Sequence, residues 1–178
     1  NLYDNSTPAK SASFASFSSS SFSNSETGSF VGNAFYEHGV LSITSTGSRY
    51  LFAGTGSIAY EFMSRGARKV TCVDQQLNAV KFINEQAKKW SMNIKTIKTN
   101  VFPYIAKESK TYDIIFADPP YDHEKIYEIP EIIFNRKLLK NGGWLILEHS
   151  KKLNFFKSAN FIEQRTYSNV NFSFFNIK

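Results

Sequence analysis

The sequence lacks several features that assign proteins to whole classes. It has one cysteine, Cys72, so no disulfide can form within the chain, which fits a reducing compartment such as the cytoplasm. No apolar run approaches the roughly 18 residues that a membrane span requires, and the N-terminus lacks the basic-then-apolar order of a secretory signal. Three histidines, widely spaced from each other and from Cys72, give no pattern of metal ligands. We therefore expect a cytoplasmic protein with no membrane segment and no metal.

Acidic residues are outnumbered by basic ones. The chain has 15 Asp and Glu against 21 Lys and Arg, a net charge of +6 in 178 residues. A basic domain of this size suits a polyanionic partner such as nucleic acid, although the same excess also describes a soluble protein with a lysine-rich surface. The basic residues are scattered in small pairs, such as Lys88 with Lys89 and Lys151 with Lys152, so the sequence alone locates no basic patch.

Residues 1–45 differ in composition from the rest of the chain. Serine occupies eleven of the first 30 positions, interleaved with phenylalanines that follow neither a helical nor a strand period. We interpret residues 1–45 as a low-complexity N-terminal segment, or one that orders only on a partner. Residues 46–178 are then a single domain, and 42% hydrophobic content is enough to give it a core.

From residue 50 onward, predicted strands and helices alternate. Alternation of this kind predicts an α/β fold, with a parallel sheet covered by helices on both faces. Two alternating runs within 161–177, on either side of Ser168 and Asn169, add an antiparallel hairpin. The predicted strands are 50–53, 70–73, 94–99, 112–117 and 144–147, and the predicted helices are 57–64, 77–90, 101–106 and 126–139.

Polar residues and glycines follow the predicted strands, at the edge where such sheets bind ligands. The run LFAGTGS, residues 51–57, joins a strand to a helix, and its glycines let the backbone approach a ligand closely. Asp74 ends the next strand, where a carboxylate can bond both hydroxyls of a ribose; the alternative is an exposed Asp that caps the following helix. Asn100 ends the third strand and is either a partner for an adenine edge or an ordinary turn residue.

A second motif, Asp118-Pro119-Pro120-Tyr121, follows the apolar run 114–117. The two prolines fix the backbone and remove two N–H donors, which leaves carbonyl groups and the Asp118 carboxylate as a pocket of hydrogen-bond acceptors. Such a pocket suits an –NH₂ group, and Tyr121 supplies a flat face on which a base can stack. The alternative is a rigid proline turn without a ligand.

The two motifs together predict methylation of an exocyclic base amine. The lone pair of such an amine is delocalised into the ring, and acceptors on its two N–H bonds favour a pyramidal nitrogen with an available lone pair. That nitrogen can attack a sulfonium methyl in line, without a metal, when both reactants are held in a near-attack geometry. In a duplex, the base would first have to be flipped out.

The sequence resembles the RsmD family of bacterial 16S rRNA guanine-N2 methyltransferases. The resemblance covers residues 51 to about 175 and rests on the runs LFAGTGSIAYEFMSRGARKVTCVD, TNVF, YDIIFADPPYD and GGWLILEHS. It implies a Rossmann-like, seven-stranded, mostly parallel sheet that ends in the antiparallel hairpin. It also implies S-adenosyl-L-methionine as the methyl donor, and a guanine of 16S rRNA, presented in an assembled or partly assembled small ribosomal subunit, as the acceptor. We expect a monomer.

The resemblance also implies a role for each matching residue. The methionine end of the donor would lie against the glycine turn, its ribose and adenine against the ends of the next two strands, and the guanine amine against the proline motif. In the same order, the residues are Ala53, Gly54, Thr55 and Gly56; Asp74; Asn100 and Val101; and Asp118, Pro119, Pro120 and Tyr121.

Two other functions remain open. An adenine-N6 methyltransferase of DNA or RNA shares the proline motif, but a DNA enzyme needs a separate target-recognition region for which the chain leaves no length. A non-catalytic nucleic-acid-binding module on the same fold is favoured by Tyr50, because the family usually has an acidic residue there that helps to hold the donor's amino group. Asn100 likewise stands where the family often has an aspartate, and residues 1–45 lack the family's basic motif.

Four further residues have two interpretations each. Lys125, Arg65 and Arg165 could contact phosphates or could be solvated surface charges. His149 follows Glu148 at a predicted strand end, where it could line the base pocket or cap a turn.

Overall fold

The structure is a computed structural model that describes residues 40–44, 56–120 and 124–177. The strand predicted at 50–53, the predicted donor-binding residues Ala53, Gly54 and Thr55, and the predicted base-stacking residue Tyr121 lie outside the described residues. Gly56, Asp74, Asn100, Val101, Asp118, Pro119 and Pro120 lie within them.

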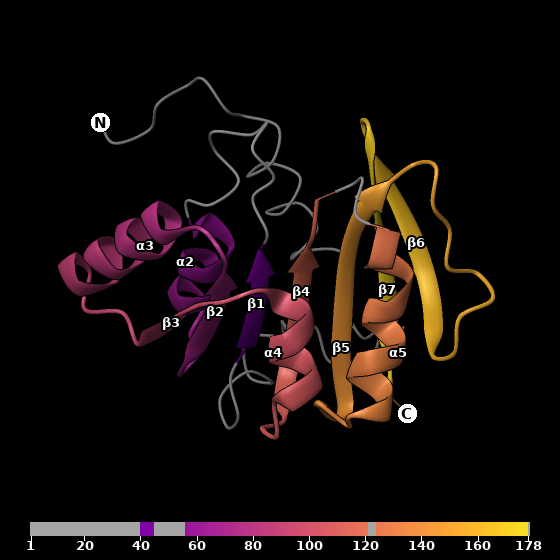
Figure 1. Cartoon of the computed structure of the whole chain (residues 1–178), viewed down its shortest axis with the longest axis horizontal. Coiled ribbons are helices and arrows are strands. Elements are labelled where there is room, and N and C mark those ends of the chain that lie inside the picture. Colours follow the sequence, from indigo (N-terminus) through magenta and orange to yellow (C-terminus); the bar gives the residue numbers. More distant parts are fainter. Residues whose placement is uncertain (1–39, 45–55, 121–123, 178) are drawn as a thin grey trace.

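Seven strands of the described residues form one sheet, in the order β3-β2-β1-β4-β5-β7-β6 (Figure 1). Strands β1 to β5 are paired in parallel, and β7 runs antiparallel to both β5 and β6. The predicted Rossmann-like α/β class is confirmed, and the sheet is mixed because the C-terminal hairpin adds two antiparallel strands. The strands are β1 (Val40–Thr44), β2 (Val70–Asp74), β3 (Ile94–Lys98), β4 (Tyr112–Asp118), β5 (Leu139–Ser150), β6 (Phe161–Tyr167) and β7 (Val170–Asn176).

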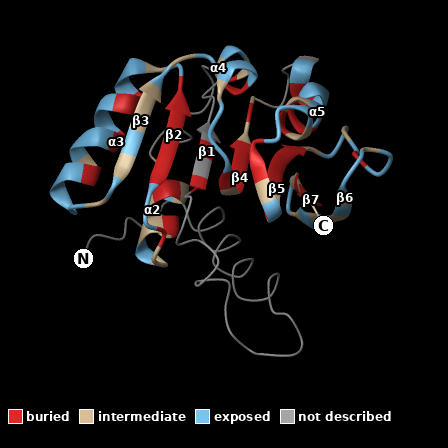
Figure 2. Cartoon of the chain, turned by 90° about the horizontal axis from the view of Figure 1, so that it is seen from below, coloured by how far each residue is buried: buried red, intermediate tan, exposed pale blue. Residues whose placement is uncertain are grey.

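Helices cover the sheet on both faces. Helices α4 and α5 lie on one face and α2 on the other, with their buried residues turned toward the sheet (Figure 2). None of the helices in the described ranges is long and apolar enough to span a membrane. The helices are α2 (Ser57–Ser64), α3 (Leu77–Lys89), α4 (Val101–Lys107), the 3₁₀ helix η2 (Glu124–Tyr127) and α5 (Glu128–Asn135).

The helix predicted over 126–139 is shorter than expected. Helix α5 ends at Asn135, and Lys137 has φ 53°, a left-handed conformation that ends a helix. Leu138 and Leu139 are buried, and Leu139 begins β5, so their apolar character belongs to the start of the strand. The turn predicted at 141–143 falls within β5, where Gly142 has φ 73°.

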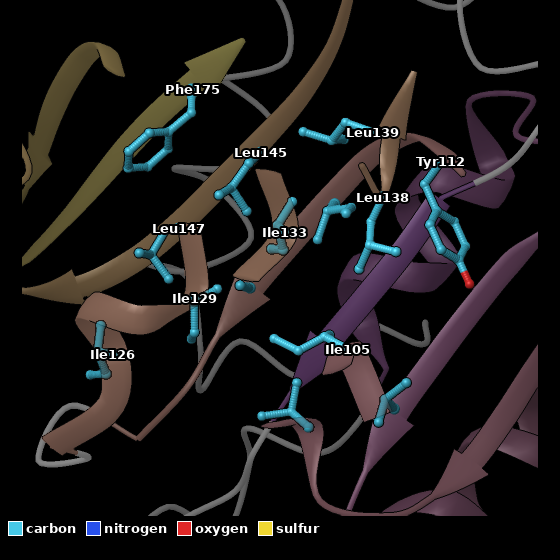
Figure 3. Packing of buried hydrophobic residues seen from close by; sticks show 14 of the residues in the cluster. Ile105, Tyr112, Ile126, Ile129, Ile133, Leu138, Leu139, Leu145, Leu147 and Phe175 are labelled. Atoms are coloured by element: carbon cyan, nitrogen blue, oxygen red, sulfur yellow. The ribbon is translucent and has the colours of Figure 1, made fainter. Parts of the chain in front are cut away.

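Side chains of alternate parity divide the core into two clusters. Because successive strand residues point to opposite faces, odd-numbered residues of β4, β5 and β7, including Ile115, Leu147 and Phe175, pack against α4 and α5 (Figure 3). Even-numbered residues, including Phe116 and Phe174, belong to the cluster that contains the buried residues of α2 and Ile83 of α3. Tyr112 is an exception, since it is even-numbered but belongs to the first cluster, and the register of β4 with β5 shifts between Tyr112 and Ile114.

The strand order reverses between β1 and β4. From β1 the chain proceeds outward through β2 to β3, and it then returns to place β4 on the other side of β1. A reversal of this kind leaves a crevice beyond the carboxyl ends of the two strands, and open α/β sheets bind their ligands there. The carboxyl edge next to β1 and β4 is thus the expected position of a site.

Candidate active site

Gly56 begins the candidate site at the N-terminus of α2. Its φ of 75° is left-handed, and a Cβ there would lie 2.7 Å from Ile83 Cγ1 and 3.0 Å from Tyr60 Oη. Only glycine fits this combination of conformation and space. No side chain caps α2, so the N–H groups of its first turn are oriented toward the carboxyl edge without a side-chain partner from the N-cap residue. This is the arrangement that favours an anionic ligand group.

Asp74 ends β2 at the same edge, as predicted, but it is buried, with 1% of its surface exposed. Its Oδ1 accepts a hydrogen bond of 2.7 Å from Gln76 N, and its carbonyl accepts one of 3.0 Å from Thr99 N. The carboxylate therefore shapes the turn that leads into α3. The alternative interpretation was an exposed aspartate that caps the following helix. The structure corrects the exposure, because Asp74 is buried where its carboxylate holds this turn.

Asn100 is the N-cap of α4. Its Oδ1 accepts a hydrogen bond of 2.9 Å from Phe102 N, which is the ordinary role of an N-cap asparagine. A carbonyl oxygen has two lone pairs, so this bond leaves capacity for an adenine amine. Val101 follows as the first residue of α4 and is buried in the core, 5% exposed. Its backbone is the part that a ligand at this edge could reach.

Asp118, Pro119 and Pro120 lie at the switch point. Asp118 is the last residue of β4 and is paired with Thr44, the last residue of β1. Pro119 is buried, whereas Asp118 and Pro120 are partly exposed. The acceptor-rich turn is therefore held rigidly at its first proline and is accessible on either side of it.

Glu148 is a neighbour of Asp118 that the sequence places at a predicted strand end but to which it assigns no role. The pairing of Ala117 with Leu147 puts Asp118 and Glu148 at the same level of adjacent strands, which lie about 4.8 Å apart. Both residues are even-numbered, so their side chains lie on the same face. Glu148 is 4% exposed. No sequence motif marks a single glutamate at a strand end, and its position beside Asp118 follows from the strand register.

His149 does not line the base pocket. Its parity turns it to the opposite face, where it is fully buried and edge-on to Phe155, with ring centroids 4.9 Å apart. Nδ1 lies 2.9 Å from the Ser150 carbonyl oxygen, which can only accept, so Nδ1 carries the proton and Ser173 Oγ donates to Nε2 over 2.8 Å. Burial lowers the pKa of His149, which favours this neutral form.

The three basic residues that could contact phosphates all interact with other groups of the chain. Arg65 Nε donates to Glu61 Oε1 over 2.6 Å, at the end of α2 that is far from the carboxyl edge. Arg165 pairs with Glu163 at 2.7 Å, and its guanidinium carbon lies 5.7 Å from the ring centroid of Phe174. Lys125 is exposed at the start of η2.

The structure brings four predicted positions to one edge of the sheet. Gly56 and Asp74 flank the first half of this edge, Asn100 lies beyond β3, and Asp118 lies at the switch point. Among the described residues, no group of three or more His, Cys, Asp or Glu is arranged to hold a metal ion. The polar groups of this edge can bind a ligand with hydroxyl and amine groups.

A protein-family model matches most of this chain. The model is described as conserved hypothetical protein 95, and it matches residues 40–176, from the first residue of β1 to the last residue of β7. The chain belongs to this family. The resemblance to RsmD-like methyltransferases is confirmed, because curated relatives of the family member carry the name ribosomal RNA small subunit methyltransferase D.

This chain matches its curated relatives over part of their length. It is 32% identical over 104 residues to a ribosomal RNA small subunit methyltransferase D of Buchnera aphidicola, which covers 58% of this chain and 53% of that protein. The corresponding protein of Escherichia coli is 26% identical over 95 residues, covering 53% and 45%. An uncharacterized methylase of Rickettsia prowazekii is 24% identical and covers 73% and 72%. The matches thus span about half the length of the relatives named ribosomal RNA small subunit methyltransferase D.

Solved structures share the fold at lower identity. A candidate methylase of Haemophilus influenzae superposes with a TM-score of 0.69 at 18% identity, covering 83% of this chain and 92% of that one. A candidate methyltransferase of Escherichia coli has a TM-score of 0.69 at 15% identity and covers 83% and 80%. Another candidate methyltransferase, crystallised with SAH, has a TM-score of 0.57 at 15% identity and covers 76% and 44%. These likenesses establish the methyltransferase-type fold.

Proposed function

We propose that this chain is an S-adenosyl-L-methionine-dependent methyltransferase that methylates the exocyclic N2 amine of a guanine in small-subunit (16S) rRNA. The observation that carries the proposal is the position of Asp118 at the switch point, paired with the last residue of the strand that precedes the Gly56 turn. The names of the curated relatives support rRNA as the substrate. The methyltransferase crystallised with SAH supports the donor.

The residues at the carboxyl edge fit this donor chemically. The left-handed Gly56 and the first-turn N–H groups of α2 suit its carboxylate, and the Asp74 carboxylate suits ribose hydroxyls, although Gln76 N already donates to one of its oxygens. When bound, the donor supplies an electrophilic methyl group on a sulfonium sulfur. The proposed donor-binding residues are Ala53, Gly54, Thr55, Gly56, Asp74, Asn100 and Val101.

Asp118 and the prolines are proposed to hold the acceptor amine. The Asp118 carboxylate and the Pro119 carbonyl accept hydrogen bonds from its two N–H groups, which favours a pyramidal nitrogen whose lone pair is less delocalised into the ring. Methyl transfer forms one N–C bond, breaks one S–C bond and releases one proton from nitrogen, for which Asp118 is the proposed acceptor. Tyr121 is proposed to stack on the base, and Pro120 to fix the turn.

Methyl transfer to small subunits tests the proposal. Subunits and protein-free 16S rRNA that lack the modification would be incubated with methyl-labelled donor, and the labelled nucleoside would be identified by mass spectrometry. We expect N2-methylguanosine at a single position. Recovery of N6-methyladenosine would favour the adenine-N6 alternative instead. We propose that the protein acts as a monomer in the cytoplasm, where small subunits are present.

Calorimetry with the donor separates the enzyme from a non-catalytic module. Tyr50 removes a carboxylate that the resemblance implies for donor binding, so the affinity for the donor is the quantity in question. We expect binding with a Kd in the micromolar range, typical of enzyme ligands. No heat of binding at millimolar donor, together with no methyl transfer, would favour the nucleic-acid-binding module.

A further inference from the structure

The loop between β5 and β6, residues 151–160, is basic and contains no acidic residue. Its ten residues include Lys151, Lys152 and Lys157. It begins directly after Ser150, the last residue of β5, and therefore leaves the sheet at the carboxyl edge. Lys151 is three residues past Glu148, which lies level with Asp118 on the adjacent strand, so the loop starts within about 15 Å of the candidate site.

The loop is fixed to the body of the protein by Phe155. This ring is 1% exposed, and its centroid lies 4.9 Å from that of His149, 5.3 Å from Tyr127 and 5.8 Å from Phe175. Backbone hydrogen bonds fold the segment further, including one of 2.8 Å from Ser158 N to the Phe155 carbonyl. The groups that the loop exposes are thus presented from a rigid base.

Four side chains project from this base into solvent. Phe156, next to the buried Phe155, is 62% exposed, and its ring is edge-on to that of Phe161 at 5.5 Å between centroids. Lys151, Lys152 and Lys157 are exposed as well. No ion pair is found for these three lysines in the described part of the chain. An exposed aromatic ring flanked by unpaired lysines combines a stacking surface with positive charge.

We propose that residues 151–157 are a docking surface for the RNA strand that carries the methylated base. Lys151, Lys152 and Lys157 contact its phosphates, and Phe156 stacks on an unpaired base next to the target. This inference rests on the proposed function, because it takes the substrate strand to be bound beside Asp118. Lysines supply the sequence-independent, salt-dependent part of RNA binding, and an aromatic ring supplies stacking that any base can satisfy.

The charge of the loop favours RNA over a protein partner. Protein interfaces are depleted in lysine at their centres, whereas three lysines without a compensating carboxylate attract a polyanion over a distance of about one Debye length. The rigid base distinguishes the loop from a solvated charged surface, since preorganised groups lose less conformational entropy when the strand binds.

Direct RNA binding by matched variants tests the proposal independently of methyl transfer. The double variant Lys151→Ala/Lys152→Ala removes two of the proposed phosphate contacts. The double variant Lys88→Ala/Lys89→Ala is the control, because these adjacent lysines are also exposed but lie at the end of α3, near the opposite edge of the sheet. Affinity for a fluorescently labelled 16S rRNA fragment would be measured by anisotropy between 50 and roughly 300 mM KCl, a range over which phosphate contacts weaken strongly.

We expect the Lys151/Lys152 variant to bind RNA about tenfold more weakly at low salt. The slope of log Kd against log [KCl] should fall by about 1 to 2, as two phosphate contacts predict, whereas the control should bind within about twofold of the wild type. Phe156→Ala should weaken binding at least about fivefold without changing the slope, and Phe156→Tyr should restore it. Donor affinity should be unchanged in all variants.

Three outcomes would overturn the docking surface. Equal losses of RNA affinity in the Lys151/Lys152 variant and in the control would show that the effect comes from net charge alone. If the Lys151/Lys152 variant keeps wild-type RNA affinity, salt dependence and methyl transfer, the docking surface is wrong but the proposed function is not. Loss confined to assembled subunits, with unchanged affinity for the protein-free RNA, would assign the loop to a ribosomal protein. Conversely, RNA binding that depends on these residues in a protein that transfers no methyl group would preserve the surface and remove the proposed function.

Discussion

The two edges of the sheet use their polar side chains differently. At the amino edge, the Tyr104 and Tyr112 hydroxyls both donate to Glu108 Oε2, the latter over 3.0 Å, and Oε1 accepts from Ser109 N and Lys110 N at 2.8 and 3.0 Å. Burial alone raises the pKa of Glu108, but these hydrogen bonds outweigh it and hold the pKa at about 2. The amino edge thus contains a closed network in which the acceptor groups already have donors.

At the carboxyl edge, side chains bond to backbone groups of the loops that follow them. Asp74 accepts from Gln76 N and Asn100 accepts from Phe102 N, so each polar residue sets the shape of the turn after its strand. The comparison indicates that polar side chains at the amino edge stabilise the fold, whereas those at the carboxyl edge fix the loops. Open α/β sheets usually bind their ligands at the carboxyl edge.

The largest expected effect separates the two ends of β4. Asp118→Ala should lower methyl transfer at least 100-fold, because it removes the proposed acceptor of the amine protons, with little change in donor affinity. Asp113→Ala is the matched control, since Asp113 lies at the start of the same strand and pairs with Lys140 Nζ at 2.7 Å. It should leave transfer within about twofold, and because the Asp113 side chain is only 11% exposed, loss of this pair should cost about 1 to 3 kcal/mol of stability.

Label transfer and thermal unfolding of both variants would be measured together. Full activity of Asp118→Ala, or an equal loss in Asp113→Ala, would contradict the division between the edges.

The second effect concerns Gly56. In Gly56→Ala the new Cβ meets Ile83 Cγ1 at 2.7 Å and forces an alanine into a left-handed φ, which should cost about 1 to 3 kcal/mol of stability. Because the same strain displaces the turn proposed to hold the donor, the donor Kd measured by calorimetry should rise at least about tenfold. Destabilisation with an unchanged Kd would separate this turn from the donor site.

The third effect tests the amino-edge network through pH. Glu108 has a folded pKa of about 2 against an ordinary value of 4.5, so its stabilisation is complete above pH 4.5 and is lost as pH falls toward 2. Since Glu108 is partly exposed, we expect Glu108→Gln to lose only about 1 to 2 kcal/mol at pH 7 and to unfold with a flatter dependence on pH below 4.5.

Urea unfolding at several pH values would measure this effect, with Glu131→Gln, an exposed residue of α5, as the control. Methyl transfer at pH 7 should be unchanged in both variants. A large loss of transfer in Glu108→Gln without a loss of stability would break the comparison.

The smallest effect concerns His149. Its pKa is lowered in the folded protein, so the unfolded chain binds more protons near pH 6, and stability should fall as pH drops below the ordinary value of 6.5. His149→Gln should reduce this pH dependence between 7 and 5.5, and Ser173→Ala should destabilise the protein at both values by removing the donor to Nε2. Thermal unfolding at the two pH values measures both, and an unaltered slope in His149→Gln would contradict the neutral, buried state.

The fold was predictable where local pattern and tertiary pairing agree. Helix α2 begins and ends as the spacing predicts, and Gly66, just past its end, has a left-handed conformation with φ 92°, as is common for glycine there. Strand β1 was not predicted, because Val40–Thr44 lies in a serine-rich context and its strand character comes from pairing with β2 and β4 on both sides. The predicted division into residues 1–45 and 46–178 stays a proposal with one change, because Val40–Thr44 is a strand of the sheet and therefore belongs to the domain.

The candidate site was predictable in its residues and less so in its interactions. Asp74, Asn100 and Asp118 could be identified because Asp74 and Asp118 end strands of the parallel sheet and Asn100 follows the end of β3 by two residues. The backbone bonds of Asp74 and Asn100 depend on loop geometry, which the sequence does not specify. Glu148 could be placed at a strand end from the sequence, but its position beside Asp118 follows only from the strand register.

Amide hydrogen exchange with and without S-adenosyl-L-methionine tests the central assignment of the donor to the carboxyl edge most directly. We predict donor-dependent protection at Gly56 and the start of α2, at 74–77 and at 100–102, with no change at 108–110 or 141–143 on the opposite edge. Protection confined to the opposite edge, or bound donor without protection at Gly56 and Asp74, would contradict the account.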